Sequence, residues 1–214
     1  TDTPRPCSAS ATRWRHTWRR RWGPFDAWPA GGVGFEYFYG FIAGEANQYD
    51  PALYEGNSPI DPPKSPEEGY HLTEDLADKA IGWIHQQKAL MPDKPFFTYF
   101  STGACHAPHH VPKEWADRYK GTFDAGWDAV RDEIFERQKA QGMIPAHSEL
   151  PARHEEIPAW EDMPDEMKPI LARQMEVYAG FLEHTDYHIG RVIDAIEEMG
   201  ALDNTLIYYI LGDN

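Results

Sequence analysis

Apolar residues recur along the chain at spacings that predict helices. Residues 175–199 carry an apolar residue every three or four positions, which is typical of a long amphipathic helix. Gly200 follows directly and is suited to end that helix as its first left-handed residue. A second helical pattern covers 73–91, with Thr73 as the predicted N-cap and Pro92 at its end. The pattern therefore predicts two substantial helices.

Two short apolar runs, 96–100 and 205–211, have the length and composition of buried strands. The second run follows the long helix after a short turn, and this helix–strand alternation predicts an α/β fold with a largely parallel sheet flanked by helices. Before these elements, residues 44–70 are rich in Pro, Gly and Asn and predict a long surface loop. Residues 128–141 predict a mostly polar helix, and the many Pro and acidic residues of 142–169 predict an extended insertion with short helices.

Composition and charge limit the class of protein. A hydrophobic content of 41% and eight Trp among 214 residues indicate a globular domain. The net charge of −15 argues against nucleic acid as a partner. The chain has no run of about 18 apolar residues, so it predicts no transmembrane helix, and it shows no apolar signal-peptide core. The compartment stays open, between bacterial cytoplasm and periplasm.

Polar side chains follow both predicted strands at the point where each strand ends. His106 comes after 96–100, and Asp213 and Asn214 come after 205–211. Open α/β folds bind ligands at the carboxyl ends of their strands. Carboxylate and carboxamide oxygens suit Ca²⁺ or Mg²⁺, and an imidazole can donate a hydrogen bond to, or protonate, a leaving oxygen. An ordinary turn or helix cap remains the alternative for Asp213 and Asn214. For His106 the alternative is a loop histidine that packs or caps.

The segment around His106 resembles the sulfatase family, whose loop has a His, a Pro two residues later and a Val-Pro shortly after. Here these are His106, Pro108 and Val111-Pro112. Gly212-Asp213-Asn214 is similar to the metal-binding Asp-Asn that follows a hydrophobic strand in this family. Gly34–Gly40 and Tyr70–Asp75 also resemble family segments, so that the resemblance covers about residues 23–214 and is to the bacterial arylsulfatase branch.

The resemblance implies an alkaline-phosphatase-like α/β hydrolase that cleaves small sulfate esters. It implies that Asp213 and Asn214 hold Ca²⁺ together with two further acidic residues, and that His106 contacts the sulfate near the leaving oxygen. The family's nucleophile is a formylglycine made from the Cys of a Cys-x-Pro-x-Arg motif. Cys7 fails this motif, because Ala9 and Ala11 stand where Pro and Arg are required. We therefore expect a central part of a sulfatase catalytic domain, incomplete at both ends and inactive by itself.

Residues 1–22 differ from the rest of the chain. They contain no Val, Ile, Leu, Met or Phe and carry a charge of about +5, which leaves about −20 for the remainder. This composition shows neither a helix nor a strand period and predicts no part of a core. A basic, transit-like arm is one interpretation. We favour an out-of-frame or wrongly assigned start, because family-like sequence begins abruptly at Gly23, and we take 23–214 as the sulfatase-like region.

Neighbours of His106 could suggest other chemistry. His109 and His110 complete a His-x-x-His-His pattern that a transition metal could use. Variable loop contacts are the favoured interpretation, because these positions vary within the family. Cys105 could pair with His106 as a nucleophile, but adjacent residues of an extended chain point in opposite directions, which favours a packing role for Cys105.

Two histidines of the long predicted helix, His184 and His188, have the i, i+4 spacing that can chelate zinc. Measured around the helix from Leu182, both lie away from the apolar stripe, so we predict a solvated face. Arg191 and Asp194 are interpreted as surface charges for the same reason.

Two other functions remain open on the sequence alone. A phosphoesterase or phosphonate hydrolase of the same superfamily would share the metal-centred layout, because the nucleophile is what separates these enzymes. A non-catalytic binding protein or pseudoenzyme could keep the fold and use its acidic surface for partners.

Overall fold

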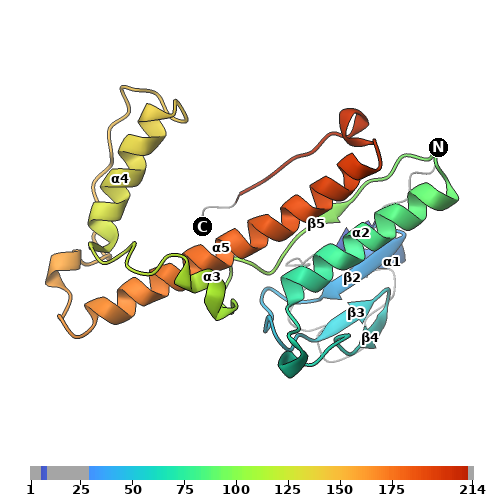
Figure 1. Ribbon diagram of the computed structural model, residues 1–214, viewed down its shortest axis with the longest axis horizontal. Helices are drawn as coiled ribbons and strands as arrows, with labels where there is room; N and C mark the ends of the chain where they lie inside the picture. Colours follow the sequence, from blue (N-terminus) through green and yellow to red (C-terminus); the bar gives the residue numbers. More distant parts are fainter. Residues whose placement is uncertain (1–5, 9–28, 212–214) are drawn as a thin grey trace. The chain divides into compact units, whose positions relative to one another are not determined.

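The computed structural model describes residues 6–8 and 29–211, which form two compact units. Unit 1 combines the described residues up to His110 with those from His184 onward, and unit 2 contains Val111–Glu183. The boundary between them falls inside the longest helix, α5 (Lys168–Glu198; Figure 1). Helix α5 therefore supplies residues to both units.

Unit 1 contains a five-stranded sheet with the order β4-β3-β2-β1-β5. Its strands are β1 (Pro6–Ser8), β2 (Tyr37–Phe41), β3 (Leu53–Glu55), β4 (Ser58–Ile60) and β5 (Tyr99–Phe100). Strand β1 pairs in parallel with both β2 and β5, whereas β2, β3 and β4 form an antiparallel meander. With helices packed beside this sheet, the predicted α/β class is confirmed.

The central strand β1 lies in a segment for which the sequence pattern predicted no strand. Cys7 pairs with Phe38 on one side and with Tyr99 on the other. Main-chain hydrogen bonds to two neighbours hold such a strand without any apolar period. The prediction that residues 1–22 contain no strand is therefore wrong for Pro6–Ser8. The other residues of that predicted arm, and the boundary at Gly23, lie outside the described residues.

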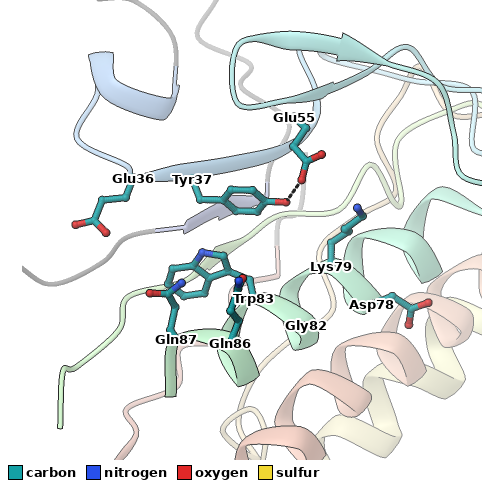
Figure 2. Close-up of a pocket in the computed structure, with 9 residues that line it drawn as sticks. All are labelled: Glu36, Tyr37, Glu55, Asp78, Lys79, Gly82, Trp83, Gln86 and Gln87. Carbon is teal, nitrogen blue, oxygen red and sulfur yellow. Dashed lines mark hydrogen bonds between the residues drawn. The ribbon is translucent and has the colours of Figure 1, made fainter. Parts of the chain in front are cut away.

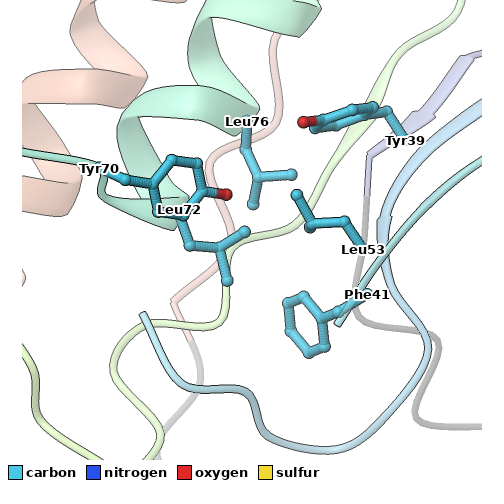
Figure 3. Packing of buried hydrophobic residues seen from close by; sticks show 6 residues of the cluster. All are labelled: Tyr39, Phe41, Leu53, Tyr70, Leu72 and Leu76. Carbon is cyan, nitrogen blue, oxygen red and sulfur yellow. The ribbon is translucent and has the colours of Figure 1, made fainter. Parts of the chain in front are cut away.

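Strand β2 is buried on both faces, as expected of a strand inside a sheet. Tyr39 and Phe41 pack with Leu53 of β3 and with the first turns of α2 (Leu72–Leu90), as Figure 3 shows. Phe38 points to the opposite face, where α1 (Pro29–Gly32) contributes Ala30. Alternating side chains of a strand produce this division.

Helix α2 also packs against the C-terminal part of α5. Ala77, Ala80, Trp83 and Ile84 of α2 form a buried cluster with Val192 and Ile196 of α5. The two helices predicted from periodicity are thus confirmed. Gly200 has φ +66° directly after α5, which confirms its predicted role in ending the helix. None of the helices in the described part of the chain is long and apolar enough to cross a membrane.

The predicted surface loop 44–70 is partly regular structure. Strands β3 and β4 form a hairpin within it, and Gly56 takes φ +59° as the first of two turn residues, a position that favours glycine. The short 3₁₀ helix η3 (Pro66–Glu68) follows. Pairing of β3 with β2 supplies the hydrogen bonds, so the high Pro and Gly content did not prevent strands here. The prediction of a long loop is therefore wrong for this hairpin.

The predicted buried strand 205–211 is not a strand in the structure. After the 3₁₀ helix η5 (Leu202–Asn204) the chain has no regular structure, and Leu206, Tyr208 and Ile210 are 78%, 78% and 85% exposed. A strand requires a neighbour that accepts its main-chain hydrogen bonds, and none of the five strands in the described ranges pairs with this segment. Its apolar composition predicted a buried strand, and this prediction is wrong, because these side chains are exposed in unit 1.

Unit 2 consists of α3 (Lys113–Asp117), α4 (Gly126–Ala140), the 3₁₀ helix η4 (Trp160–Asp162) and the first part of α5. The helix predicted over 128–141 is confirmed with slightly earlier bounds, as is the irregular segment before α5. The carboxylate of Glu176 in α5 is buried, and it accepts hydrogen bonds from the Gly121 amide and the Arg173 guanidinium, both at 2.7 Å. Burial is the largest single influence on the pKa of Glu176 and raises it. The bonds to Arg173 and Gly121 together outweigh burial, so the pKa of Glu176 is lowered.

Candidate functional site

The carboxyl ends of the parallel strands lie at one edge of the sheet, because β2, β1 and β5 run in the same direction. Strand β2 ends at Phe41 and β5 ends at Phe100. The prediction of a buried strand over 96–100 is wrong in extent and burial, because β5 contains only Tyr99 and Phe100 and Tyr99 is 50% exposed. The loops that follow these two strands carry Glu45 and His106. The sequence predicted the position of His106. It contained no signal for Glu45, an isolated acid in a loop distant in sequence.

The imidazole of His106 is about half exposed, with its side chain 55% accessible. Its Nδ1 lies 2.7 Å from the carbonyl oxygen of Ala107, which can only accept, so Nδ1 carries the hydrogen. In the neutral ring Nε2 then carries no hydrogen and can accept a hydrogen bond, whereas in the protonated ring it can donate one. The Glu45 carboxylate lies 3.7 Å from Nδ1, within ion-pair distance of a protonated ring. His106 can thus present Nε2 to a ligand, and the Glu45 carboxylate can balance the charge of a protonated His106 ring.

The loop that carries His106 is held at its first end by close packing of Gly103. A Cβ atom on this buried residue would lie 2.9 Å from Nε2 of Gln48 and 3.3 Å from Cζ of Phe41. A side chain at this position would force the Gln48 amide and the Phe41 ring to shift, so glycine allows the loop to approach β2 and the segment after it closely. The amide of His106 donates to the Gly103 carbonyl at 3.1 Å and closes a turn at this end.

The other end of the loop is held through His110. Its carbonyl oxygen lies 3.1 Å from Nε2 of His71, and its Nδ1 lies 3.1 Å from Oδ1 of Asn47. The His110 ring also stacks on Tyr49, with 5.5 Å between centroids and 19° between planes. His110 thus acts as a structural contact of the loop, in agreement with the preference for loop contacts over a three-histidine metal site.

His71 and not the predicted Thr73 is the N-cap of α2. The Nδ1 atom of His71 accepts the amide of Thr73 at 3.2 Å, while Thr73 itself lies inside the first turn and is fully buried. A ring nitrogen that accepts an N–H satisfies a free helix amide just as a hydroxyl would. Burial lowers the pKa of His71 to about 4, so the ring is neutral near pH 7. Propensity favours Thr over His at a cap, which is why the sequence pattern missed this role.

His184 and His188 are buried, so their predicted solvated face is wrong. They are 2% and 6% exposed, whereas Leu182, from which the apolar stripe was measured, is 42% exposed. The physical reason is that α5 packs in two different units on either side of Glu183, and one stripe does not describe both halves. Asp194 is exposed as predicted, but Arg191 is not an isolated surface charge.

The buried histidines are linked in a line of polar contacts. Arg191 bonds to Asp78 at 2.5 Å and donates to Nδ1 of His188 at 3.0 Å. Since a guanidinium only donates, Nε2 of neutral His188 carries the hydrogen and donates to Nε2 of His184 at 3.2 Å. The His184 ring in turn meets His71 edge-on, with 4.3 Å between centroids. Burial, with the positive charge of Arg191 second, lowers the pKa of His188 to about 4.

No metal centre is assembled among the described residues. In residues 6–8 and 29–211 no group of three or more His, Cys, Asp and Glu side chains is arranged to hold an ion. Asp213 and Asn214, the predicted Ca²⁺ ligands, lie outside the described residues. Their oxygen donors fit Ca²⁺ in kind, but two residues cannot supply the six to eight oxygens that this ion takes. These two residues can therefore form only part of a calcium site.

A polar cavity of about 490 Å³ lies elsewhere in unit 1, beside the start of β2 and the middle of α2 (Figure 2). Its lining includes three carboxylates and one ammonium group, from Glu36, Glu55, Asp78 and Lys79. The hydroxyl of Tyr37 donates to Glu55 at 2.6 Å across it. Because it opens at the amino end of β2, this cavity is separate from the edge that carries His106.

Comparison with known proteins identifies the class of this fold. The described chain superimposes on a Bacteroides fragilis protein assigned to the sulfatases, yidJ, with a TM-score of 0.52 and 17% identity over 94% of this chain and 38% of the other. A second solved structure, in complex with its substrate D-glucosamine-2-N,6-O-disulfate, gives a TM-score of 0.52 and 16% identity over 94% of this chain and 46% of the other. The fold is thus the alkaline-phosphatase-like α/β fold of the sulfatases.

Sequence comparison defines the family. The family model described as Sulfatase matches residues 9–214. An uncharacterized sulfatase of Schizosaccharomyces pombe is 34% identical over 193 residues, covering 89% of this chain and 34% of that protein. An arylsulfatase of Klebsiella aerogenes is 27% identical over 186 residues, covering 83% of this chain and 39% of that protein. The chain belongs to the sulfatase family, and it spans between a third and two fifths of the length of these relatives.

Proposed function

We propose that this chain is part of an enzyme that hydrolyses sulfate esters to an alcohol or phenol and sulfate. The observation that carries the proposal is the family match over residues 9–214, combined with His106 at the carboxyl edge of the parallel strands. The relatives support an aryl or sugar sulfate as the substrate class, since one is named arylsulfatase and another was solved with a sulfated glucosamine.

In this proposal His106 engages the ester at the leaving oxygen. Its Nδ1–H is occupied by the Ala107 carbonyl, so the ring donates to the sulfate from Nε2–H in its imidazolium form, or passes that proton to the leaving oxygen and becomes neutral. Glu45 balances the positive charge of the ring before the proton is transferred. We assign no nucleophile, because Cys7 lacks the Pro and Arg that a formylglycine motif requires at positions 9 and 11.

Asp213 and Asn214 are proposed to hold one Ca²⁺ together with ligands from elsewhere in the intact enzyme. When bound, the cation supplies charge neutralisation at the sulfate oxygens. Because these two residues provide only part of the coordination shell, we propose that the 214-residue chain binds Ca²⁺ weakly and is inactive alone. Ca²⁺-dependent turnover of an aryl sulfate by the purified 214-residue chain would overturn this point.

The test of His106 uses its exposed neighbour His109 as the matched control. In the intact protein, His106→Ala should lower kcat for p-nitrophenyl sulfate by about 10²–10⁴-fold, the usual contribution of a general acid. His109→Ala, in the same loop, should change kcat by less than about threefold. Equal effects of the two substitutions would refute the role of His106. Faster hydrolysis of p-nitrophenyl phosphate than of the sulfate would instead identify a phosphoesterase, and turnover of neither would favour a binding protein.

A further inference from the structure

We propose that His71 is a positioning residue that holds the His106 loop through its Nε2–H bond to the His110 carbonyl. The inference rests on the proposed function of His106 and adds a residue that acts on it from the start of α2. His71 does not touch the exposed edge where a substrate would bind, because it is only 3% exposed. Its effect on the reaction would therefore pass through the loop.

The two bonds of His71 require one and the same tautomer. The Thr73 amide can only donate, so Nδ1 must be the unprotonated nitrogen. The hydrogen is then on Nε2, which is what the His110 carbonyl needs, since a carbonyl only accepts. The helix amide thus selects the ring state that anchors the loop, and a ring protonated on both nitrogens would lose the bond to Thr73.

The packing around His71 fixes the direction in which Nε2 points. Tyr49 meets the ring edge-on at 5.4 Å and 87°, and His184 meets it at 4.3 Å and 62°. Tyr49 also stacks on His110, so the same aromatic ring contacts both partners of the anchoring bond. A rigid donor on a helix end is thereby aimed at the base of an exposed loop, four residues beyond His106.

Two substitutions separate the helix cap from the loop anchor. The amide group of Asn occupies the place of Nδ1 of a histidine, so His71→Asn keeps an acceptor for Thr73 and loses the bond to His110. The amide group of Gln occupies the place of Nε2, so His71→Gln keeps a donor for His110 and loses the cap. If His71 is purely structural, His71→Asn, which keeps the helix cap, should retain more activity. If His71 positions the loop, His71→Gln, which keeps the bond to His110, should retain more activity.

The first measurement uses the 214-residue chain and needs no activity. Amide hydrogen exchange at His106, whose N–H bonds to Gly103, should be about tenfold faster in His71→Asn than in wild type and nearly unchanged in His71→Gln. The urea midpoint should fall more in His71→Gln, which loses the cap. In the wild type, the long-range ¹⁵N–¹H spectrum should show neutral His71 protonated on Nε2. A proton on Nδ1, or equal exchange in all three proteins, would overturn the inference.

The second measurement uses the intact protein and p-nitrophenyl sulfate. We expect His71→Asn to lower kcat about tenfold or more with a smaller change in KM, and His71→Gln to retain most of the wild-type kcat. The reverse order, with activity following the urea midpoint, would overturn the positioning role. The expected exchange pattern in a protein that turns over only phosphate esters would support the loop anchor while refuting the proposed sulfatase activity.

Discussion

Two glycines of helix α5, Gly180 and Gly190, should respond in opposite directions to the same substitution. A Cβ atom at Gly180 would lie 2.6 Å from the backbone nitrogen of Ala116, and 2.7 Å from both Cα of Ala116 and the carbonyl carbon of Trp115. These atoms belong to the backbone of α3 and cannot rotate away. A Cβ atom at Gly190 would meet no atom within 4 Å.

The size of each effect follows from these contacts. Replacing Gly by Ala inside a helix stabilises it by up to about 1 kcal/mol. Overpacking against a well-fitted interior costs about 1–3 kcal/mol, and contacts this short with backbone atoms belong at the upper end. We therefore expect Gly180→Ala to lower the free energy of unfolding by about 2 kcal/mol. Gly190→Ala should raise it by up to about 1 kcal/mol.

Urea unfolding followed by far-ultraviolet circular dichroism measures both variants, with native-state hydrogen exchange to assign the change to unit 2 or unit 1. Gly180→Ala should have a lower midpoint than the wild type and faster exchange at the α3 amides. Stabilisation of the chain by both substitutions would refute the close packing of α3 on Gly180.

Two further predictions concern buried ionisable groups of unit 1. Asp75 is 7% exposed and accepts the hydroxyls of Tyr39 and Tyr70 at 2.5 and 2.9 Å, so Asp75→Ala should lower the free energy of unfolding by about 3 kcal/mol, and Asp75→Asn by less, in the same urea assay. An equal loss in both variants would contradict this bonding. The pKa of His71, lowered from 6.5 to about 4, makes the unfolded chain bind the proton more readily. The contribution of neutral His71 to the free energy of unfolding is therefore fully present above about pH 6.5. It decreases as the pH falls towards 4, by up to about 3 kcal/mol. As the pH is lowered across this range, the urea midpoint should fall less steeply in His71→Asn than in the wild type. The same pH dependence in both proteins would contradict the prediction.

Local patterns predicted much of the fold and the position of one candidate site residue. The helices α2, α4 and α5 were found from their apolar period or composition, because burial of one helical face repeats every three to four residues. Gly200 was found because a left-handed position after a helix requires glycine. His106 was placed after its strand because strand ends follow directly from the apolar run. The family resemblance extended these local features to a class of enzyme.

Only the tertiary structure decided which residues surround His106. Glu45 and His71 come from segments distant in sequence from His106, and neither forms a motif with it. His184 and His188 are buried because α5 packs in two units, which one helical stripe cannot express. Strand β1 forms without an apolar pattern because its neighbours on both sides supply hydrogen bonds. Residues 205–211 have the apolar pattern of a strand, but none of the described strands pairs with them. The sequence by itself determined the family and the local elements, since period and motif are properties of adjacent residues. Pairing, burial and hydrogen-bond partners depend on distant residues, so only the folded chain determines them.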